Sequence, residues 1–222
     1  VEKEKSEFII DEEPNYNVFN LKFGVSDRNL INYNSFNTDL QFSKNFGKLS
    51  ASYEYRKIFS NNRQVNFRAF AGAFLYNKTN SDFFSFALDR PSDYLFDYNY
   101  YGRSESTGIY SQQIIIADGG FKSKLETPFA NDWMMTANTG TTLWKYILAY
   151  GDVGVLKNNG NTEFVYDSGI HVNLVPDYFE LYFPVYSNLG WEVGQPHYAD
   201  KIRFKITLTP KILIGLFTRK WL

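Results

Sequence analysis

Several stretches of this chain alternate apolar and polar residues for roughly ten residues each, and they are spread over almost its whole length. The clearest stretch sets Ile202, Phe204, Ile206 and Leu208 against Arg203, Lys205, Thr207 and Thr209. This is the period of a β-strand, whose successive side chains point to opposite faces. A tilted strand of about 9–11 residues crosses a bilayer, and a barrel turns one face to lipid and the other to its lumen. The alternation therefore predicts an outer-membrane β-barrel.

Composition agrees with a barrel and excludes a helical membrane protein. The chain has 222 residues and is 44% hydrophobic, yet it contains no apolar run approaching the length of about 18 residues that a membrane helix needs. Its 17 Tyr, 21 Phe and 4 Trp make 19% of the residues. Barrels use such rings in the lipid-facing band and in the girdles at both interfaces. The alternative is an aromatic-rich soluble β-sandwich.

Charge and cysteine content narrow the function classes. The formal net charge is −1, from 23 basic and 24 acidic residues mixed along the chain, so nucleic-acid binding is disfavoured. The absence of Cys is compatible with a reducing compartment and with a cell-envelope protein. The charged run at residues 2–5 indicates either that a leader has been removed or that the chain belongs to a longer polypeptide.

The predicted fold class is all-β, an antiparallel up-and-down transmembrane β-barrel of about 8–10 strands, or part of a larger barrel. Nine strands are expected, with 81–90 as a tenth: 16–26, 36–46, 49–59, 65–76, 121–125, 146–156, 163–175, 178–188 and 201–209. Residues 1–15 are expected to form an acidic linker or tail, 16–210 the barrel, and 211–222 a short amphipathic periplasmic or interfacial segment.

Turn and loop signals complete this prediction. Tight turns are expected at Gly47-Lys48, 61–64, 158–161 and 175–177. The alternation of apolar and polar residues stops over 77–118. We expect this stretch to be a long extracellular loop that acts as a lid or plug. An odd number of strands would start residue 16 on the outside, which implies either a misassigned strand or earlier strands elsewhere.

The candidate interaction residues are charged and face the predicted lumen. Glu54, Arg56 and Arg68 fall on the polar side of the hairpin 49–59 and 65–76. Arg103 and Glu105 of the long loop are expected to reach back and pair with this cluster, holding the loop as a plug. The alternative is a surface loop in which the glycines merely turn the chain.

Motifs for catalysis and for metal binding are missing. The two histidines, His171 and His197, lie in no zinc-binding pattern, and there is no nucleophile elbow, phosphate-binding loop or dinucleotide fingerprint. We therefore predict no catalytic residue, no metal site and no cofactor. The alternative is a small outer-membrane hydrolase that uses loop carboxylates such as Asp93, Asp97 and Glu105.

A series of segments resembles one family in content and order: 67–72, 93–97, 102–105, 111–113, 119–122, 164–169 and 179–184. Over about 65–209 the chain looks like the C-terminal barrel region of Bacteroidota envelope proteins whose N-terminal part resembles a gluzincin aminopeptidase. That barrel is distantly similar to the outer-membrane insertase superfamily, in which an Arg-bearing extracellular loop folds into the lumen. The resemblance implies that Arg103 is the corresponding loop residue.

The expected function follows from the strand pattern and the missing motifs. We expect an integral barrel in the outer membrane of a Gram-negative bacterium, with its lumen plugged. Its partners would be outer-membrane lipid and other proteins of a multi-subunit envelope complex, for which it acts as an anchor or docking subunit. The alternative is the barrel portion of a metallopeptidase whose catalytic domain lies outside this chain.

Overall fold

The computed structural model describes residues 17–29, 31–79, 82–90, 92, 94–95, 108–175 and 179–206. Nearly all regular structure in these ranges is antiparallel β. The main strands are β1 (Phe19–Arg28), β2 (Asn32–Phe42), β3 (Phe46–Ile58), β4 (Gln64–Asn77), β7 (Trp133–Trp144), β8 (Ile147–Asn158), β9 (Asn161–Val175), β10 (Phe179–Ser187) and β12 (Arg203–Ile206). The all-β, up-and-down fold class is confirmed.

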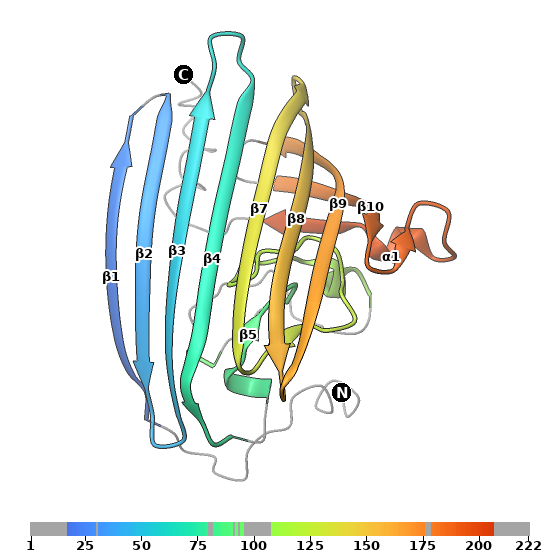
Figure 1. Ribbon diagram of the computed structural model, residues 1–222. Helices are drawn as coiled ribbons and strands as arrows, with labels where there is room; N and C mark the ends of the chain where they lie inside the picture. The colour runs from blue at the N-terminus through green and yellow to red at the C-terminus, as the bar shows by residue number, and fades with distance from the viewer. Residues whose placement is uncertain are drawn as a thin grey trace.

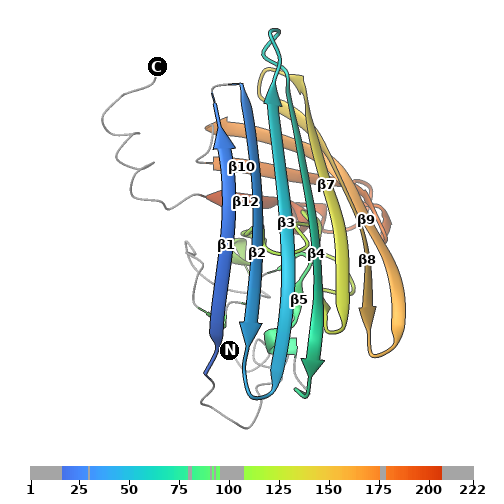
Figure 2. The same cartoon turned by 60° about the vertical axis from the view of Figure 1, so that its left-hand side comes forward.

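Consecutive strands lie side by side in one ten-stranded sheet with the order β1-β2-β3-β4-β7-β8-β9-β10, as Figure 1 shows. Strand β10 also pairs with β12 and with the short β11 (Gly190–Trp191), and α1 (Tyr198–Lys201) precedes β12. Both views show β10 and β12 running across the long strands (Figures 1 and 2). Among the described strands, β1 pairs with β2 alone, so the sheet does not close within these ranges.

The connection between β4 and β7, residues 78–132, is here called the internal segment. It contains η2 (Asp82–Phe84), β5 (Phe86–Ala87), η3 (Ile109–Gln112) and β6 (Phe129–Ala130), and β5 pairs with β6. Its described parts pack on one face of the sheet, which we call the inner face. None of the helices in the described part of the chain has the length and apolarity needed to cross a bilayer.

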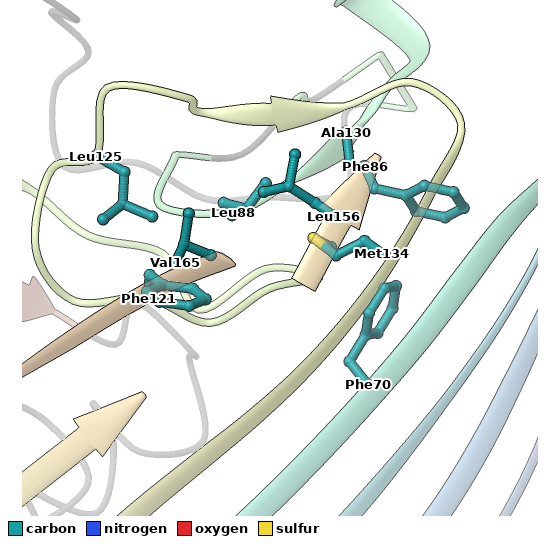
Figure 3. Packing of buried hydrophobic residues seen from close by; sticks show 9 residues of the cluster. All are labelled: Phe70, Phe86, Leu88, Phe121, Leu125, Ala130, Met134, Leu156 and Val165. Carbon is teal, nitrogen blue, oxygen red and sulfur yellow. The ribbon is translucent and has the colours of Figure 1, made fainter. Parts of the chain in front are cut away.

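The hydrophobic core lies between the inner face and the internal segment. Phe70, Met134, Leu156 and Val165 project from β4, β7, β8 and β9. They meet buried side chains of the internal segment, which Figure 3 shows together with them: Phe86, Leu88, Phe121, Leu125 and Ala130. Burying each large apolar side chain contributes about 1.5–3 kcal/mol. This packing fixes the internal segment against the strands.

The opposite face of the long strands, here called the outer face, is apolar and exposed. One row of direct cross-strand neighbours crosses seven strands: Val25, Phe36, Tyr53, Ala69, Ala137, Val153 and Tyr166. On the same face Phe23, Met135 and Phe164 are 60%, 59% and 58% exposed. In the described strands from β1 to β9, charged residues occur on this face only near strand ends. This distribution is the reverse of that in a soluble sheet, whose solvent-facing side is polar.

Several sequence predictions need correction. The expected turn at Gly47-Lys48 is wrong, because the chain turns at 43–45 and both residues lie inside β3. Residues 121–125 form no strand, and of the expected strand 81–90 the described residues 82–90 contain η2 and the two-residue β5 but no longer strand. Strand β7 was not predicted at all.

Other predicted elements fall outside the described residues. These are the acidic tail 1–15, the turn residues 176–177, the end of the last strand from 207 and the C-terminal segment 211–222. By contrast, the turn at 158–161 is confirmed, with Asn159 and Gly160 at φ 47° and 85° between β8 and β9.

Candidate functional site

A row of polar residues crosses the inner face, and each residue stands directly opposite the next one on the neighbouring strand. It consists of Ser35, Glu54, Arg68, Asn138, Asp152 and Asp167, from β2, β3, β4, β7, β8 and β9. We call this set the polar row. Such neighbours lie close enough for their side chains to interact. The antiparallel register therefore gathers four ionisable side chains, one amide and one hydroxyl into one line beneath the internal segment.

The internal segment binds the middle of the polar row through its backbone. Arg68 Nη1 donates to the carbonyl of Asp118 at 2.7 Å and to Asn138 Oδ1 at 3.1 Å. Asn138 Nδ2 donates to the carbonyl of Gly119 at 3.0 Å. Gly120 has φ 73°, and a Cβ there would lie 2.7 Å from Asn138 Oδ1 and 2.9 Å from Arg68 Nη1. Glycine is required here both for the left-handed backbone and for this close approach.

The far end of the row holds two buried carboxyl groups. Asp152 and Asp167 are cross-strand neighbours and are 1% and 2% exposed. Lys122 of the internal segment places Nζ 2.5 Å from Asp152 Oδ1. The backbone N–H groups of Lys122 and Ser123 donate to Asp167 Oδ2 at 3.1 and 2.6 Å. Buried charges are tolerated only when they are paired and hydrogen-bonded, so this arrangement requires the internal segment in place.

Further contacts tie the internal segment to other parts of the sheet. Arg203 of β12 is buried and its Nη1 lies 3.5 Å from the carbonyl of Lys122. Lys48 of β3 donates from Nζ to the carbonyl of Phe84 at 2.9 Å. Within the segment, Asp118 accepts a hydrogen bond from the backbone N–H of Ala87 at 3.0 Å. The inner face therefore holds the segment at several separate points.

The predicted interaction residues are brought together in part. Arg68 Nε lies 3.6 Å from Glu54 Oε1, as expected of cross-strand neighbours. Arg56 lies two residues beyond Glu54 on β3, on the same face. Its guanidinium is 5.7 Å from the centre of the Tyr33 ring. Arg103 and Glu105 lie outside the described residues, as do Asp93 and Asp97. The pairing of Arg103 and Glu105 with the cluster stays a prediction.

Sequence reasoning missed Lys122, Asn138, Asp152 and Asp167 as site residues. One signal was available. The dipeptide Gly119-Gly120 precedes Lys122, and adjacent glycines often mark a close approach of backbone to another group. Asp167 falls on the polar side of its stretch, with Glu163 and His171, whereas the residues that share a face with Asp152 are mostly apolar. However, no local pattern indicates that they meet the same residue of a distant segment.

A second polar cluster lies on β9, β10 and β12. Glu180 accepts a hydrogen bond from Tyr182 at 2.5 Å, and its carboxylate lies 3.4 Å from both His171 Nε2 and Lys205 Nζ. The rings of His171 and Tyr182 stack with centres 4.5 Å apart. The described residues contain no group of three His, Cys, Asp or Glu placed to hold a metal ion. The cluster joins β9, β10 and β12 on the inner face through the Glu180–Lys205 ion pair and the stacking of His171 on Tyr182.

Comparison with protein-family models, with curated proteins and with solved structures returns no match to this chain.

Proposed function

We propose that this chain is the membrane-embedded wall of an outer-membrane β-barrel that anchors or docks a larger envelope complex, with its interior plugged by the internal segment. The observation that carries the proposal is the exposed apolar outer face. Its charged residues in the described strands, Asp27, Lys57 and Lys157, lie near strand ends. A lipid-facing barrel wall has this distribution, because a charge at mid-membrane costs about 2–4 kcal/mol.

Aromatic residues at the strand ends support the same proposal. Phe59, Trp144 and Tyr146 are exposed near the turns at one end of the long strands. At the other end, Tyr76 is exposed and Trp133 is half-buried. Amphipathic rings prefer the two membrane interfaces, where barrels carry aromatic girdles.

The plugged interior is supported by the contacts of the internal segment. It packs apolar side chains against the inner face and binds the polar row through Arg68, Asn138 and Lys122. A small barrel has an interior that side chains and loops can fill, whereas open channels belong to barrels of about 16 or more strands. Docking of a larger complex is favoured by the resemblance to barrel regions that follow a peptidase-like part.

Cysteine labelling tests the membrane wall directly, because the chain contains no native Cys. Met135→Cys places a thiol on the outer face, whereas Lys57→Cys places one near the end of β3 on the same face. In phospholipid vesicles, a water-soluble maleimide should label the Lys57→Cys site and leave the Met135→Cys site unlabelled. Detergent-free extraction of a folded protein with both sites fully labelled would contradict the proposal.

The plug is tested separately, in planar bilayers. The wild-type protein is expected to insert without forming large stable channels. Steady conductance of the size seen for open porins would contradict a plugged interior, and it would leave the membrane wall itself supported.

A further inference from the structure

A cavity of about 730 Å³ lies on the inner face and has a strongly basic lining. The charged residues that line it are Arg28, Arg56, Arg68, Lys122, Lys145, Lys205, Glu54 and Glu180. Six of these are basic and two are acidic, although the whole chain has a net charge of −1. Positive charge is therefore concentrated in this cavity. A cavity that gathers one sign of charge raises the local concentration of counter-ions.

The basic residues differ in how their charge is balanced. Arg68, Lys122 and Lys205 each lie within 4.0 Å of a carboxylate, those of Glu54, Asp152 and Glu180. Within the described ranges, no ion pair is formed by Arg28 or by Arg56. Each instead places its guanidinium near the same aromatic ring, that of Tyr33, at 5.0 and 5.7 Å from the ring centre. A ring attracts a cation but does not neutralise it.

The strand register sets this arrangement. Tyr33 of β2 stands directly opposite Arg28 of β1 on one side and opposite Arg56 of β3 on the other. On the next strands, the same row continues with Asn66 and then Gly140. Gly140 carries no side chain, and a Cβ there would meet no atom closer than 3.7 Å. Two like charges thus converge on one ring, and an anion bound beside them would reduce their mutual repulsion.

We propose that the Arg28–Tyr33–Arg56 row binds an anion of the phosphate class, either a soluble phosphate compound or a phosphomonoester headgroup. A phosphate dianion balances both guanidiniums, whereas one carboxylate balances only one. Guanidinium forks match phosphate oxygens with paired, charge-assisted hydrogen bonds. The aromatic side chains of Tyr33, Tyr146 and Tyr150, which also line the cavity, supply apolar contact for the rest of such a ligand.

Binding of a soluble phosphate compound is tested by calorimetric titration of the full chain with inorganic pyrophosphate. The protein is kept in a zwitterionic detergent at constant ionic strength. Wild type is expected to bind saturably. The variant Arg28→Gln/Arg56→Gln should bind at least about tenfold more weakly, because it loses two charge-assisted contacts. The matched control Lys57→Gln/Lys157→Gln removes two charges from the outer face and should bind like wild type. This arm requires no bilayer, so it can succeed or fail independently of the proposed membrane wall.

Binding of a phosphomonoester headgroup is tested by thermal unfolding in phosphatidylcholine nanodiscs with and without phosphatidic acid. Stabilisation by phosphatidic acid that disappears in Arg28→Gln/Arg56→Gln and persists in the control would support the site with a lipid ligand. The far-ultraviolet circular dichroism of the variant, compared with wild type, shows whether the sheet is intact. A folded double variant that responds like wild type in both arms would overturn the proposal, as would a wild type that responds in neither arm.

Discussion

Lys122 supplies the positive charge next to two buried carboxyl groups, so replacing it should strongly reduce the free energy of unfolding. Its Nζ lies 2.5 Å from Asp152 Oδ1, and Asp152 is 1% exposed. Lys122→Met would leave a buried carboxylate without its cation, which typically costs about 3–5 kcal/mol. We expect a loss of this size in the free energy of unfolding, measured by urea titration in detergent.

Two comparisons make this prediction specific. The double variant Lys122→Met/Asp152→Asn should lose less stability than Lys122→Met alone, because the Asp152 charge that would lack its cation is removed as well. Lys157→Met removes a cation from the outer face and should change stability by less than about 0.5 kcal/mol. An equal loss for Lys157→Met and Lys122→Met would contradict the role assigned to the buried pair.

Gly120 and Gly160 form a matched pair for testing how closely the internal segment approaches the polar row. Both have positive φ, 73° and 85°, but a Cβ on Gly160 would meet nothing within 4 Å. Gly160→Ala should therefore cost only the left-handed backbone penalty of about 1–2 kcal/mol. Gly120→Ala should cost more, because its Cβ would meet Asn138 and Arg68. Similar unfolding midpoints for the two variants would count against the close approach.

Sequence reasoning reaches some of these residues and misses others for a physical reason. Glu54 and Arg68 belong to adjacent strands joined by a short turn, so the period-2 pattern and the turn position bring them together. Lys122 and Asp167 meet through a segment that has no period of its own. Their contact depends on tertiary packing, which leaves no local pattern in the chain.

At the scale of elements, the alternation predicts strands well where the outer positions are large and apolar. Strand β7 was missed because its two faces differ little in polarity: its outer positions include Thr139 and Thr141, and its inner positions include Met134 and Gly140. The turn at 43–45 was misplaced because Gly47-Lys48 is the stronger local turn signal. In the structure, Gly47 instead lies at a register shift of β3 against β4.

Charged substitutions on β7 and β8 test the outer face by depth. Val153 and Leu143 are both outward-facing and are 47% and 54% exposed, but Leu143 lies beside the β7–β8 turn. Val153→Arg should destabilise the protein by about 2–4 kcal/mol in vesicles, and Leu143→Arg by about 1 kcal/mol or less. The measurement is urea unfolding after reconstitution. Equal effects would indicate that both positions face water.

At the scale of the whole molecule, the edge of β1 that faces away from β2 distinguishes a location in lipid from a location in water. Among the described strands, the neighbour of β1 is β2 alone, and no described strand lies along its other edge. Hydrocarbon does not tolerate an open sheet edge. In vesicles, hydrogen exchange should therefore show all β1 amides protected, with another strand covering this edge. Rapid exchange of alternate β1 amides would argue against a membrane location.

The polar row also has a consequence for assembly of the sheet. Because side chains alternate between faces, a slip of β8 by one residue would turn Asp152 outward and bring Val153 inward. The same slip would separate Asp152 from Lys122 and place its charge where the outer face is apolar. A one-residue slip of β3 or β9 would likewise turn Glu54 or Asp167 toward the apolar outer face. Glu54, Asp152 and Asp167 therefore penalise one-residue slips of the three strands that carry them, β3, β8 and β9, during folding.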